Sequence, residues 1–168
     1  MPETTVIVNT SPLLYLHQIG QLQLLQELYG KVTVPTGVPQ ELKAGKLLGV
    51  DVPKINSIEW IEVRPVASIA LIPAVIDLGQ GEAEVLALGL EIPDPLLIFD
   101  DKLARRIADL YKLKYTGTLG ILIKAKQRGY LGSVAPIIAM LQSQGMWLND
   151  KIINDILRLC GEVGREFD

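Results

Sequence analysis

The sequence predicts an α/β fold built on a parallel sheet, and two observations support this class. Short runs of β-branched and other apolar residues alternate along the chain with segments of helical periodicity. The composition of the 168-residue chain, 49% hydrophobic and 21% charged, excludes a disordered protein, which would be poorer in apolar residues. We therefore expect one globular domain over residues 1–168, long enough to bury a core.

The first strand and the first helices lie at the start of the chain. Residues 5–8 (Thr-Val-Ile-Val) are typical of a buried strand. We expect Ser11 to cap the next helix, with Pro12 at its first position and Gly20 at its end. A second helix is expected over about 22–28.

A second strand is predicted over residues 32–34. Pro39 suits the first position of the following helix, which would place Glu41 in the first helical turn. Residues 58–63 resemble an edge strand, and 64–80 form a connection interrupted by Pro and Gly that could include a short helix.

The second half of the chain repeats the alternation of helix and strand. A helix is predicted over 81–90, and the run 95–99 (Pro-Leu-Leu-Ile-Phe) is typical of a buried strand whose first residue can be Pro. The helix over 102–111 follows, and its spacing places Leu110 among the inward-facing residues.

The last elements are a short strand over 113–116 and three helices. Thr118 is expected to cap the helix over 119–127. Two more helices, near 134–144 and 149–159, complete the chain.

Several classes of protein and of site are excluded by composition. Cys160 is the only cysteine and His17 the only histidine, which excludes an internal disulfide, a cysteine zinc site and a multi-histidine metal site. The longest mostly apolar stretch, 66–76, is too short to cross a membrane, and the N-terminus lacks the basic region of a secretory signal. We therefore expect a cytoplasmic protein without a membrane span.

Oxygen-bearing side chains follow the predicted strands or begin the predicted helices. In open α/β sheets, ligand sites form outside the carboxyl ends of the strands. Carboxylate and amide oxygens suit Mg²⁺ or Mn²⁺, and such an ion can activate water and stabilise the charge of a phosphodiester that is being cleaved. The candidate residues are Asn9, Glu41, Glu82, Asp100, Asp101, Thr116 and Thr118.

Capping and ordinary ion pairs explain some of these residues equally well. Asp and Glu are common in first helical turns, so Glu41 and Glu82 taken alone fit solvent-exposed acids. Asp101 precedes Arg105 by four residues, the spacing of a helical ion pair. Asp100 is the stronger functional candidate, because two adjacent acids directly after a buried strand are costly without a cation.

The charge distribution bears on the partner. The net charge of −3 argues against a nucleic-acid binder. Residues 102–128 nevertheless hold eight basic residues and one acidic residue, a local net charge of +7, directly after the Asp100 pair. Two interpretations stay open: a basic rim that holds phosphates beside a metal site, or solvated helix faces.

Five motifs in order resemble those of PIN-domain nucleases, in particular a prokaryotic branch related to the VapC-type toxins. The motifs are Asn9-Thr10-Ser11-Pro12-Leu13, Val34-Pro35 with Pro39-Gln40-Glu41-Leu42, Gly81-Glu82-Ala83-Glu84, Ile98-Phe99-Asp100-Asp101, and Gly117-Thr118-Leu119-Gly120. The resemblance spans about residues 6–162. It implies a three-layer α/β/α sandwich with a mainly parallel sheet, Mg²⁺- or Mn²⁺-dependent cleavage of RNA, a homodimer, and a small antitoxin protein as partner.

The resemblance also assigns roles to residues. Asn9 falls where the family has its first Asp, and Glu41, Glu82 and Asp100 match the other acids, so these four would be catalytic. Glu41, Glu82 and Asp100 would hold the metal, with Asp101 as a possible substitute. The residues expected to contact substrate are Thr10, Ser11, Lys102, Arg105, Arg106 and Thr118.

Asn9 departs from the family pattern, since an amide brings no negative charge and cannot act as a base. Two hypotheses follow. The leading one is a metal-dependent endoribonuclease that acts as the toxin of a toxin–antitoxin pair. The alternative is a catalytically weak or inactive PIN-fold protein that binds RNA or a protein partner. A phosphoacceptor signalling domain is disfavoured, because its acid pair belongs at the first strand.

Overall fold

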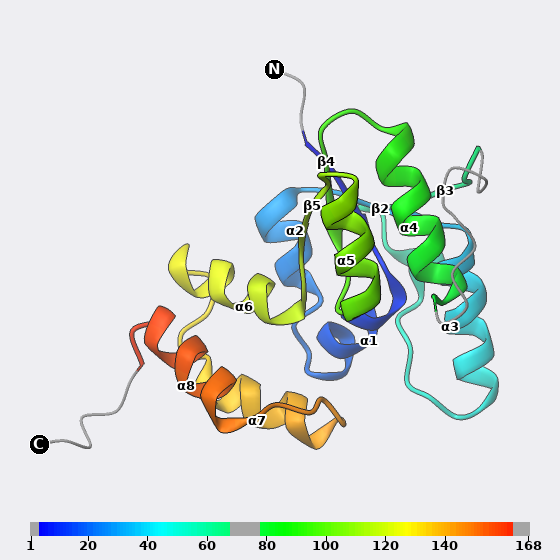
Figure 1. Ribbon diagram of the computed structural model, residues 1–168. Helices are drawn as coiled ribbons and strands as arrows, with labels where there is room; N and C mark the ends of the chain where they lie inside the picture. The colour runs from blue at the N-terminus through cyan, green and yellow to red at the C-terminus, as the bar shows by residue number, and fades with distance from the viewer. Residues whose placement is uncertain (1–3, 68–77, 163–168) are drawn as a thin grey trace, which may run out of the picture.

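A parallel five-stranded sheet forms the centre of the computed structural model (Figure 1), which describes residues 4–67 and 78–162. Its strands are β1 (Thr5–Val8), β2 (Val32–Pro35), β3 (Ile61–Arg64), β4 (Pro95–Ile98) and β5 (Lys114–Thr116). They are ordered β3-β2-β1-β4-β5, and every neighbouring pair is parallel. The predicted α/β class with a parallel sheet is confirmed.

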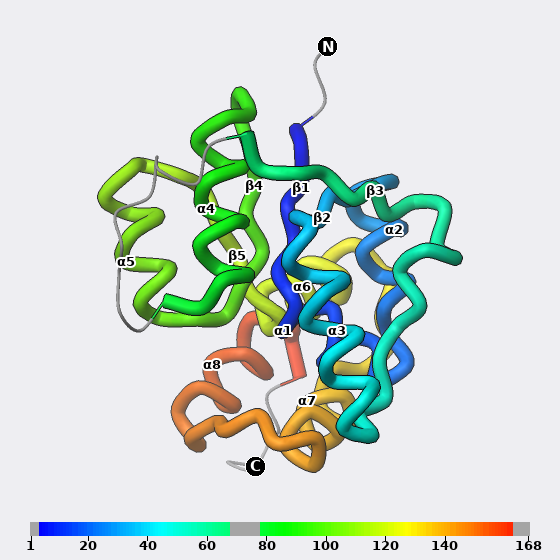
Figure 2. Tube along the Cα trace, turned by 90° about the vertical axis from the view of Figure 1, so that its right-hand side faces the viewer, coloured from blue at the N-terminus to red at the C-terminus, as the bar shows by residue number. Residues whose placement is uncertain are grey.

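Helices cover both faces of the sheet, as Figure 2 shows: α4 and α5 lie on one side, and α2 and α6 on the other. This arrangement confirms the expected three-layer sandwich. The helices are α1 (Thr10–Gln18), α2 (Gln23–Tyr29), α3 (Gly37–Leu47), α4 (Gln80–Glu91), α5 (Lys102–Leu110), α6 (Thr118–Gln127), α7 (Ala135–Ser143) and α8 (Asp150–Leu159), with a 3₁₀ turn at η1 (Ile55–Ser57).

The chain reverses its direction of winding between β1 and β4. It leaves β1 through α1 and α2 to reach β2, but it returns to β4 through α4 on the opposite face. The switch in strand order therefore falls at the carboxyl ends of β1 and β4, the position where open α/β sheets bind ligands. The backbone N–H of Asn9 donates a hydrogen bond to the Ile98 carbonyl (2.9 Å) and holds the two strand ends together there.

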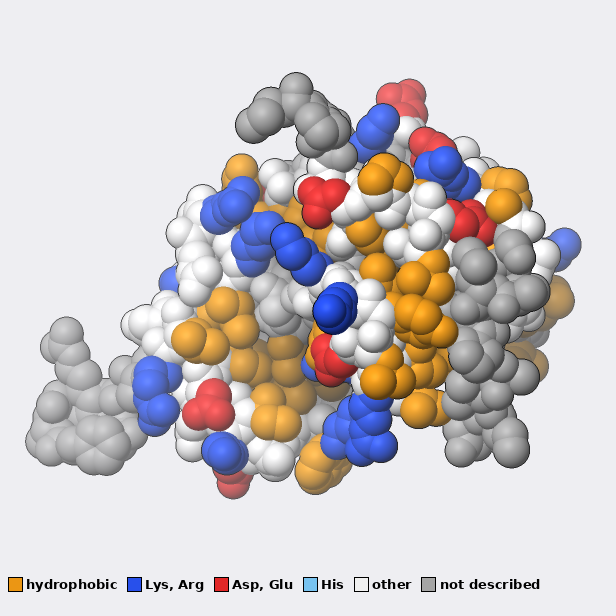
Figure 3. Space-filling view, turned by 45° about the horizontal axis from the view of Figure 1, so that its top comes forward, with side chains coloured by type: hydrophobic (Ala, Val, Ile, Leu, Met, Phe, Trp, Pro, Cys, Tyr) orange, Lys and Arg blue, Asp and Glu red, His pale blue; other side chains and the backbone are white. Residues whose placement is uncertain are grey.

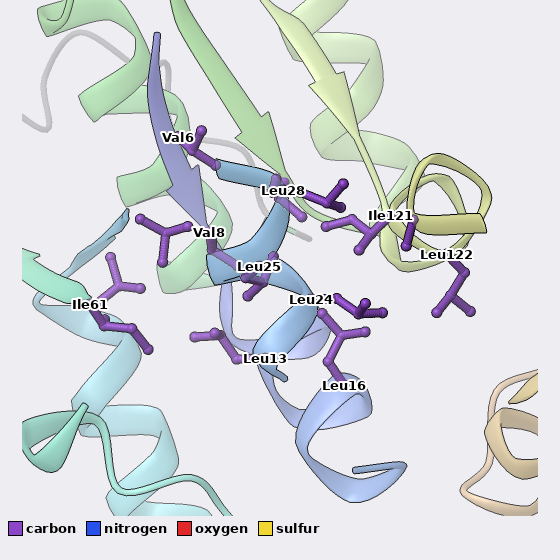
Figure 4. Packing of buried hydrophobic residues seen from close by; sticks show 14 of the residues in the cluster. Val6, Val8, Leu13, Leu16, Leu24, Leu25, Leu28, Ile61, Ile121 and Leu122 are labelled. Atoms are coloured by element: carbon purple, nitrogen blue, oxygen red, sulfur yellow. The ribbon is translucent and has the colours of Figure 1, made fainter. Parts of the chain in front are cut away.

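Two apolar clusters, one on each face, form most of the core. Val6 and Val8 of β1 point towards α1, α2 and α6 (Figure 4), whereas Ile7 points towards α4 and α5. The alternation follows from the two-residue repeat of a strand. Because both faces are covered, the central strands are apolar on both sides, which explains the continuous apolar runs of the sequence.

The last two helices pack on α6 through a smaller cluster that includes the buried Cys160. Glu162, which follows α8, fixes their arrangement. It accepts hydrogen bonds from the Val134 amide (2.7 Å) and the Ser133 hydroxyl (2.8 Å) at the start of α7. The ammonium of Lys126 on α6 lies 3.4 Å from the same carboxylate. One side chain thus joins α6, α7 and α8.

α5 begins at Lys102 as predicted, but the other predicted helix starts are wrong by one or two residues. Asn9, not Ser11, is the N-cap residue of α1, so Pro12 is its third residue. α3 likewise begins at Gly37 and not at Pro39, which moves Glu41 out of the first turn. Proline is tolerated throughout a first turn, because the amides there have no partner within the helix.

Three further details differ from expectation. Leu110 is 80% exposed and does not face the core, because α5 ends there. The edge strand β3 starts later than predicted, at Ile61. Thr118 is the first residue of α6, not its cap. Part of the predicted 64–80 connection, residues 68–77, lies outside the described residues. No helix in the described part is both long and apolar enough to span a bilayer.

Candidate active site

Asn9 and Glu41 approach each other at the switch point, beside the carboxyl ends of β1 and β4. Asn9 is 2% exposed, and its Oδ1 has no hydrogen-bond partner among the described residues. Gly81, the second residue of α4, lies against both side chains. A methyl group at Gly81 would overlap Oε1 of Glu41 and lie 2.5 Å from Oδ1 of Asn9. The absence of a side chain at Gly81 therefore lets these two oxygens share one small space.

The surroundings of Glu41 disfavour its negative charge. Burial of the carboxylate and the nearby charge of Glu82 raise the pKa of Glu41 above its usual value of 4.5. The Thr10 hydroxyl and the Gly81 amide offset part of this rise. Thr10 is itself buried, and its side-chain hydroxyl makes no hydrogen bond of ordinary geometry with the described residues. Two of the predicted site residues, Asn9 and Thr10, thus present oxygens with spare acceptor capacity beside the Glu41 carboxylate.

The first two glutamates of α4 differ in their surroundings. Glu82 lies in the first turn, as predicted, and is partly exposed. Glu84 is buried, and sequence reasoning gave it no role. Its Oε1 accepts hydrogen bonds from the Gly37 amide (3.2 Å) and the Thr36 hydroxyl (3.3 Å), while its Oε2 has no partner within the described residues. The helical spacing from Gly81 to Glu84 was a usable signal, because it places both on the buried face of α4.

Asp100 is held in place by its own partners. Its Oδ1 accepts a hydrogen bond from the Thr118 amide (2.8 Å), and its Oδ2 accepts one from the Thr118 hydroxyl (2.7 Å). The guanidinium of Arg105 lies 3.9 Å away and also donates to the Phe99 carbonyl (3.4 Å). Asp100 is therefore a fixed carboxylate beside a cation, unlike Glu41.

The first turn of α5 does not have the ion pair expected from its spacing. Asp101 is the N-cap residue, and its Oδ2 accepts a hydrogen bond from the Ala104 amide (2.9 Å). Arg105 instead turns towards Asp100. Lys102 and Arg106 lie on the same helix, and both are exposed. Ser11, in the first turn of α1, is partly exposed.

The basic residues of segment 102–128 do not form one continuous rim. Because the chain runs through α5 from the carboxyl end of β4 to the amino end of β5 and then back along β5, these residues separate. Arg105 lies at the carboxyl edge, whereas Lys114, Lys124 and Arg128 line a hollow at the amino ends of β1 and β4. Figure 3 brings the top of Figure 1 forward and shows Lys and Arg side chains in a row on that face. Lys126 is bound to Glu162.

The side-chain oxygens of Asn9 and Glu41 are of the type that binds a hard divalent cation, but they are few in number. Within residues 4–67 and 78–162, no three His, Cys, Asp or Glu side chains lie close enough together to hold a metal ion. Mg²⁺, however, commonly binds through one or two carboxylates and keeps several waters. The unpartnered Oδ1 of Asn9 and the carboxylate of Glu41 fit such a site.

The family model of the PIN domain matches residues 5–162. The chain belongs to the PIN-domain family. The match includes all five strands of the sheet and every predicted site residue, and it confirms the family expected from the motifs. PIN domains are generally nucleases that use divalent metals. No curated protein matches this PIN domain significantly.

Proposed function

We propose that this PIN domain is a Mg²⁺- or Mn²⁺-dependent endoribonuclease. One observation carries the proposal: an unpartnered buried amide oxygen of Asn9 and the carboxylate of Glu41 share the space beside Gly81, at the carboxyl ends of β1 and β4. Unsatisfied buried oxygens are rare in native proteins and are usually explained by a bound water, a bound ion or a functional role. A divalent cation satisfies an amide oxygen and a carboxylate at once.

In this proposal Asn9, Glu41 and Glu82 hold the cation, and Asp100 completes the acidic side of the site. A bound cation would neutralise charge on the scissile phosphate and favour ionisation of a water. Asp101 is left to its capping role, because its carboxylate is bonded to the start of α5.

The protein's own residues perform the remaining steps. The carboxylate of Glu41, which lies with Asn9 against Gly81, would also accept a hydrogen bond from the attacking water and orient it. Arg105, with Lys102 and Arg106 on the same helix, would pair with phosphates of the RNA. Thr118 positions Asp100 through two hydrogen bonds. Thr10 and Ser11 would bind substrate at the start of α1.

The biological role that we propose is that of a cytoplasmic toxin, active as a homodimer and neutralised by a small antitoxin protein. The support for this role is the resemblance of the five motifs to VapC-type toxins. Isolation of the chain from its native host tests it: a small protein should co-purify with the chain. Recovery of the chain alone would contradict the toxin–antitoxin assignment.

The nuclease proposal is tested by cleavage of single-stranded RNA in Mn²⁺ or Mg²⁺, with Asp100→Asn as the variant. The substitution keeps the size of the side chain and a hydrogen bond to Thr118, so the fold should persist. We expect the rate to fall by about 100-fold, since a charge in the site is lost. Equal rates for the two proteins would remove Asp100 from the site.

A binding protein without nuclease activity is the second candidate, and the amide at Asn9 together with the hydrogen-bonded Asp100 favours it. Calorimetric titration with Mn²⁺ separates the two. The nuclease proposal predicts binding by the unaltered protein and tighter binding by Asn9→Asp. Binding by Asn9→Asp alone would favour the inactive protein.

A further inference from the structure

A hollow of about 350 Å³ lies next to the candidate active site, and of its lining residues only Asp100 and Arg105 have a role in the proposed cleavage of RNA. It is lined by Asp100 and Arg105 on one side, by the end of β5 and the first turn of α6, and by the loop between α7 and α8. Its volume falls within the range of small-molecule sites. Because Asp100 belongs to both, a molecule in the hollow would touch the active site.

The hollow has aromatic side chains on two of its elements. Trp147, in the loop between α7 and α8, is 79% exposed, so most of its ring is free of contacts with the described residues. Tyr115 of β5 stacks on Phe99, with ring centroids 5.5 Å apart and planes at 24°. Tyr115 is fixed by that contact, whereas the indole of Trp147 offers a free flat apolar face.

Arg105 gives the hollow a cation with donors to spare. Its guanidinium lies 5.5 Å from the centroid of the Tyr115 ring, and one nitrogen donates to the Phe99 carbonyl. Its Nε is buried and has no hydrogen-bond partner among the described residues. Arginine has five N–H donors in a planar fork that matches phosphate. A side chain at Gly117 would overlap this guanidinium and lie 2.5 Å from Oδ1 of Asp100. Glycine there keeps the cation and the acid together.

We propose that this hollow is a nucleobase subsite, in which the ring of Trp147 stacks on one base of an RNA strand and Arg105 binds a neighbouring phosphate. A flat apolar face and a phosphate-binding cation in one hollow match a nucleotide, which presents a flat base and an anion a few bonds apart. The inference rests on the proposed action on RNA. It adds that one nucleotide is held beside Asp100 by stacking, which tolerates any base.

The first experiment measures stacking without cleavage. The chain has two tryptophans, so Trp60→Phe leaves Trp147 as the only indole. This variant is titrated with an RNA hexanucleotide in EDTA, and tryptophan fluorescence is followed. We expect saturable quenching by the RNA and none by ribose 5-phosphate, which has no base. Absence of saturable quenching, or equal quenching by both compounds, would overturn the subsite.

The second experiment measures the contribution of Trp147 to affinity. Binding of the same RNA, fluorescently labelled, is followed by polarisation in EDTA. We expect Trp147→Ala to weaken binding about tenfold and Trp147→Phe to restore most of it. The matched control is Tyr130→Ala, which removes another exposed aromatic ring, 46% exposed and outside the hollow, and should leave affinity unchanged. Equal loss in Trp147→Ala and Tyr130→Ala would overturn the subsite.

The two proposals fail separately. If the unaltered protein binds RNA with quenching of Trp147 but does not cleave it with either metal, the nuclease proposal falls and the subsite stands. If it cleaves RNA while Trp147 neither reports binding nor affects affinity, the subsite falls and the nuclease stands.

Discussion

Glu41 and Glu162 are two glutamates with opposite surroundings. Glu162 receives hydrogen bonds from the Val134 and Ala135 amides and from Ser133, and it lies near Lys126. Burial alone would raise the pKa of Glu162, but these partners outweigh burial and lower it. Glu41 is subject to burial and a like charge with fewer partners, so its pKa is raised.

The difference separates a structural carboxylate from the carboxylate that we propose to be functional. The chain surrounds Glu162 with donors and uses it to join three helices. It leaves the Glu41 carboxylate beside the unpartnered Asn9 oxygen. A proton on Glu41, or the cation that we propose, would stabilise this arrangement. Perturbed carboxylates of the second kind cluster at functional sites. Substitution of each glutamate by glutamine should therefore affect a different property.

The largest expected effect is on activity. Glu41→Gln should lower the rate of RNA cleavage by about 100-fold or more, since it removes the charge of a carboxylate that we propose as a ligand of the cation. The folded state should not suffer, because a glutamine amide can donate to Oδ1 of Asn9. Single-turnover cleavage in Mn²⁺ measures the rate. Glu162→Gln is the control and should cleave at close to the unaltered rate while folded.

The next effect is on stability. Glu162→Gln should destabilise the protein by about 2 kcal/mol, because it weakens charge-assisted hydrogen bonds at the start of α7 and the pairing with Lys126. Urea denaturation followed by circular dichroism measures this change. Glu41→Gln should show no such loss. If Glu41→Gln were the more destabilised variant, the roles assigned to the two residues would be reversed.

The fold was predictable because its signals are local. Residues 5–8 and 95–99 are apolar runs of strand length, and both form central strands covered on two faces. The helix starts were less predictable, because Pro12 fits any position of a first turn. Leu110 fitted the apolar spacing of α5, but the helix ends there and its side chain faces solvent.

The candidate site was predictable in its residue types and less so in its contacts. Placement of Asn9 and Asp100 at neighbouring strand ends follows from the parallel topology. The approach of Glu41 to Asn9 depends on the missing side chain of Gly81, which has no periodic signal. The cap formed by Glu162 joins residues far apart in sequence, and only the packing of α7 and α8 on α6 brings them together.

The smallest effects should appear in the pH dependence of stability, with opposite signs at the two glutamates. The lowered pKa of Glu162 means that its stabilisation is present above the pKa of the unfolded chain and is lost as pH falls through the folded pKa. The raised pKa of Glu41 has the reverse effect: its contribution is present below the unfolded pKa and is lost as pH rises through the folded pKa. Thermal melts from about pH 2 to pH 8 in EDTA should therefore show Glu162→Gln converging on the unaltered protein in acid, and Glu41→Gln rising above it towards neutral pH. Parallel curves for both variants would show that neither carboxylate is perturbed as described.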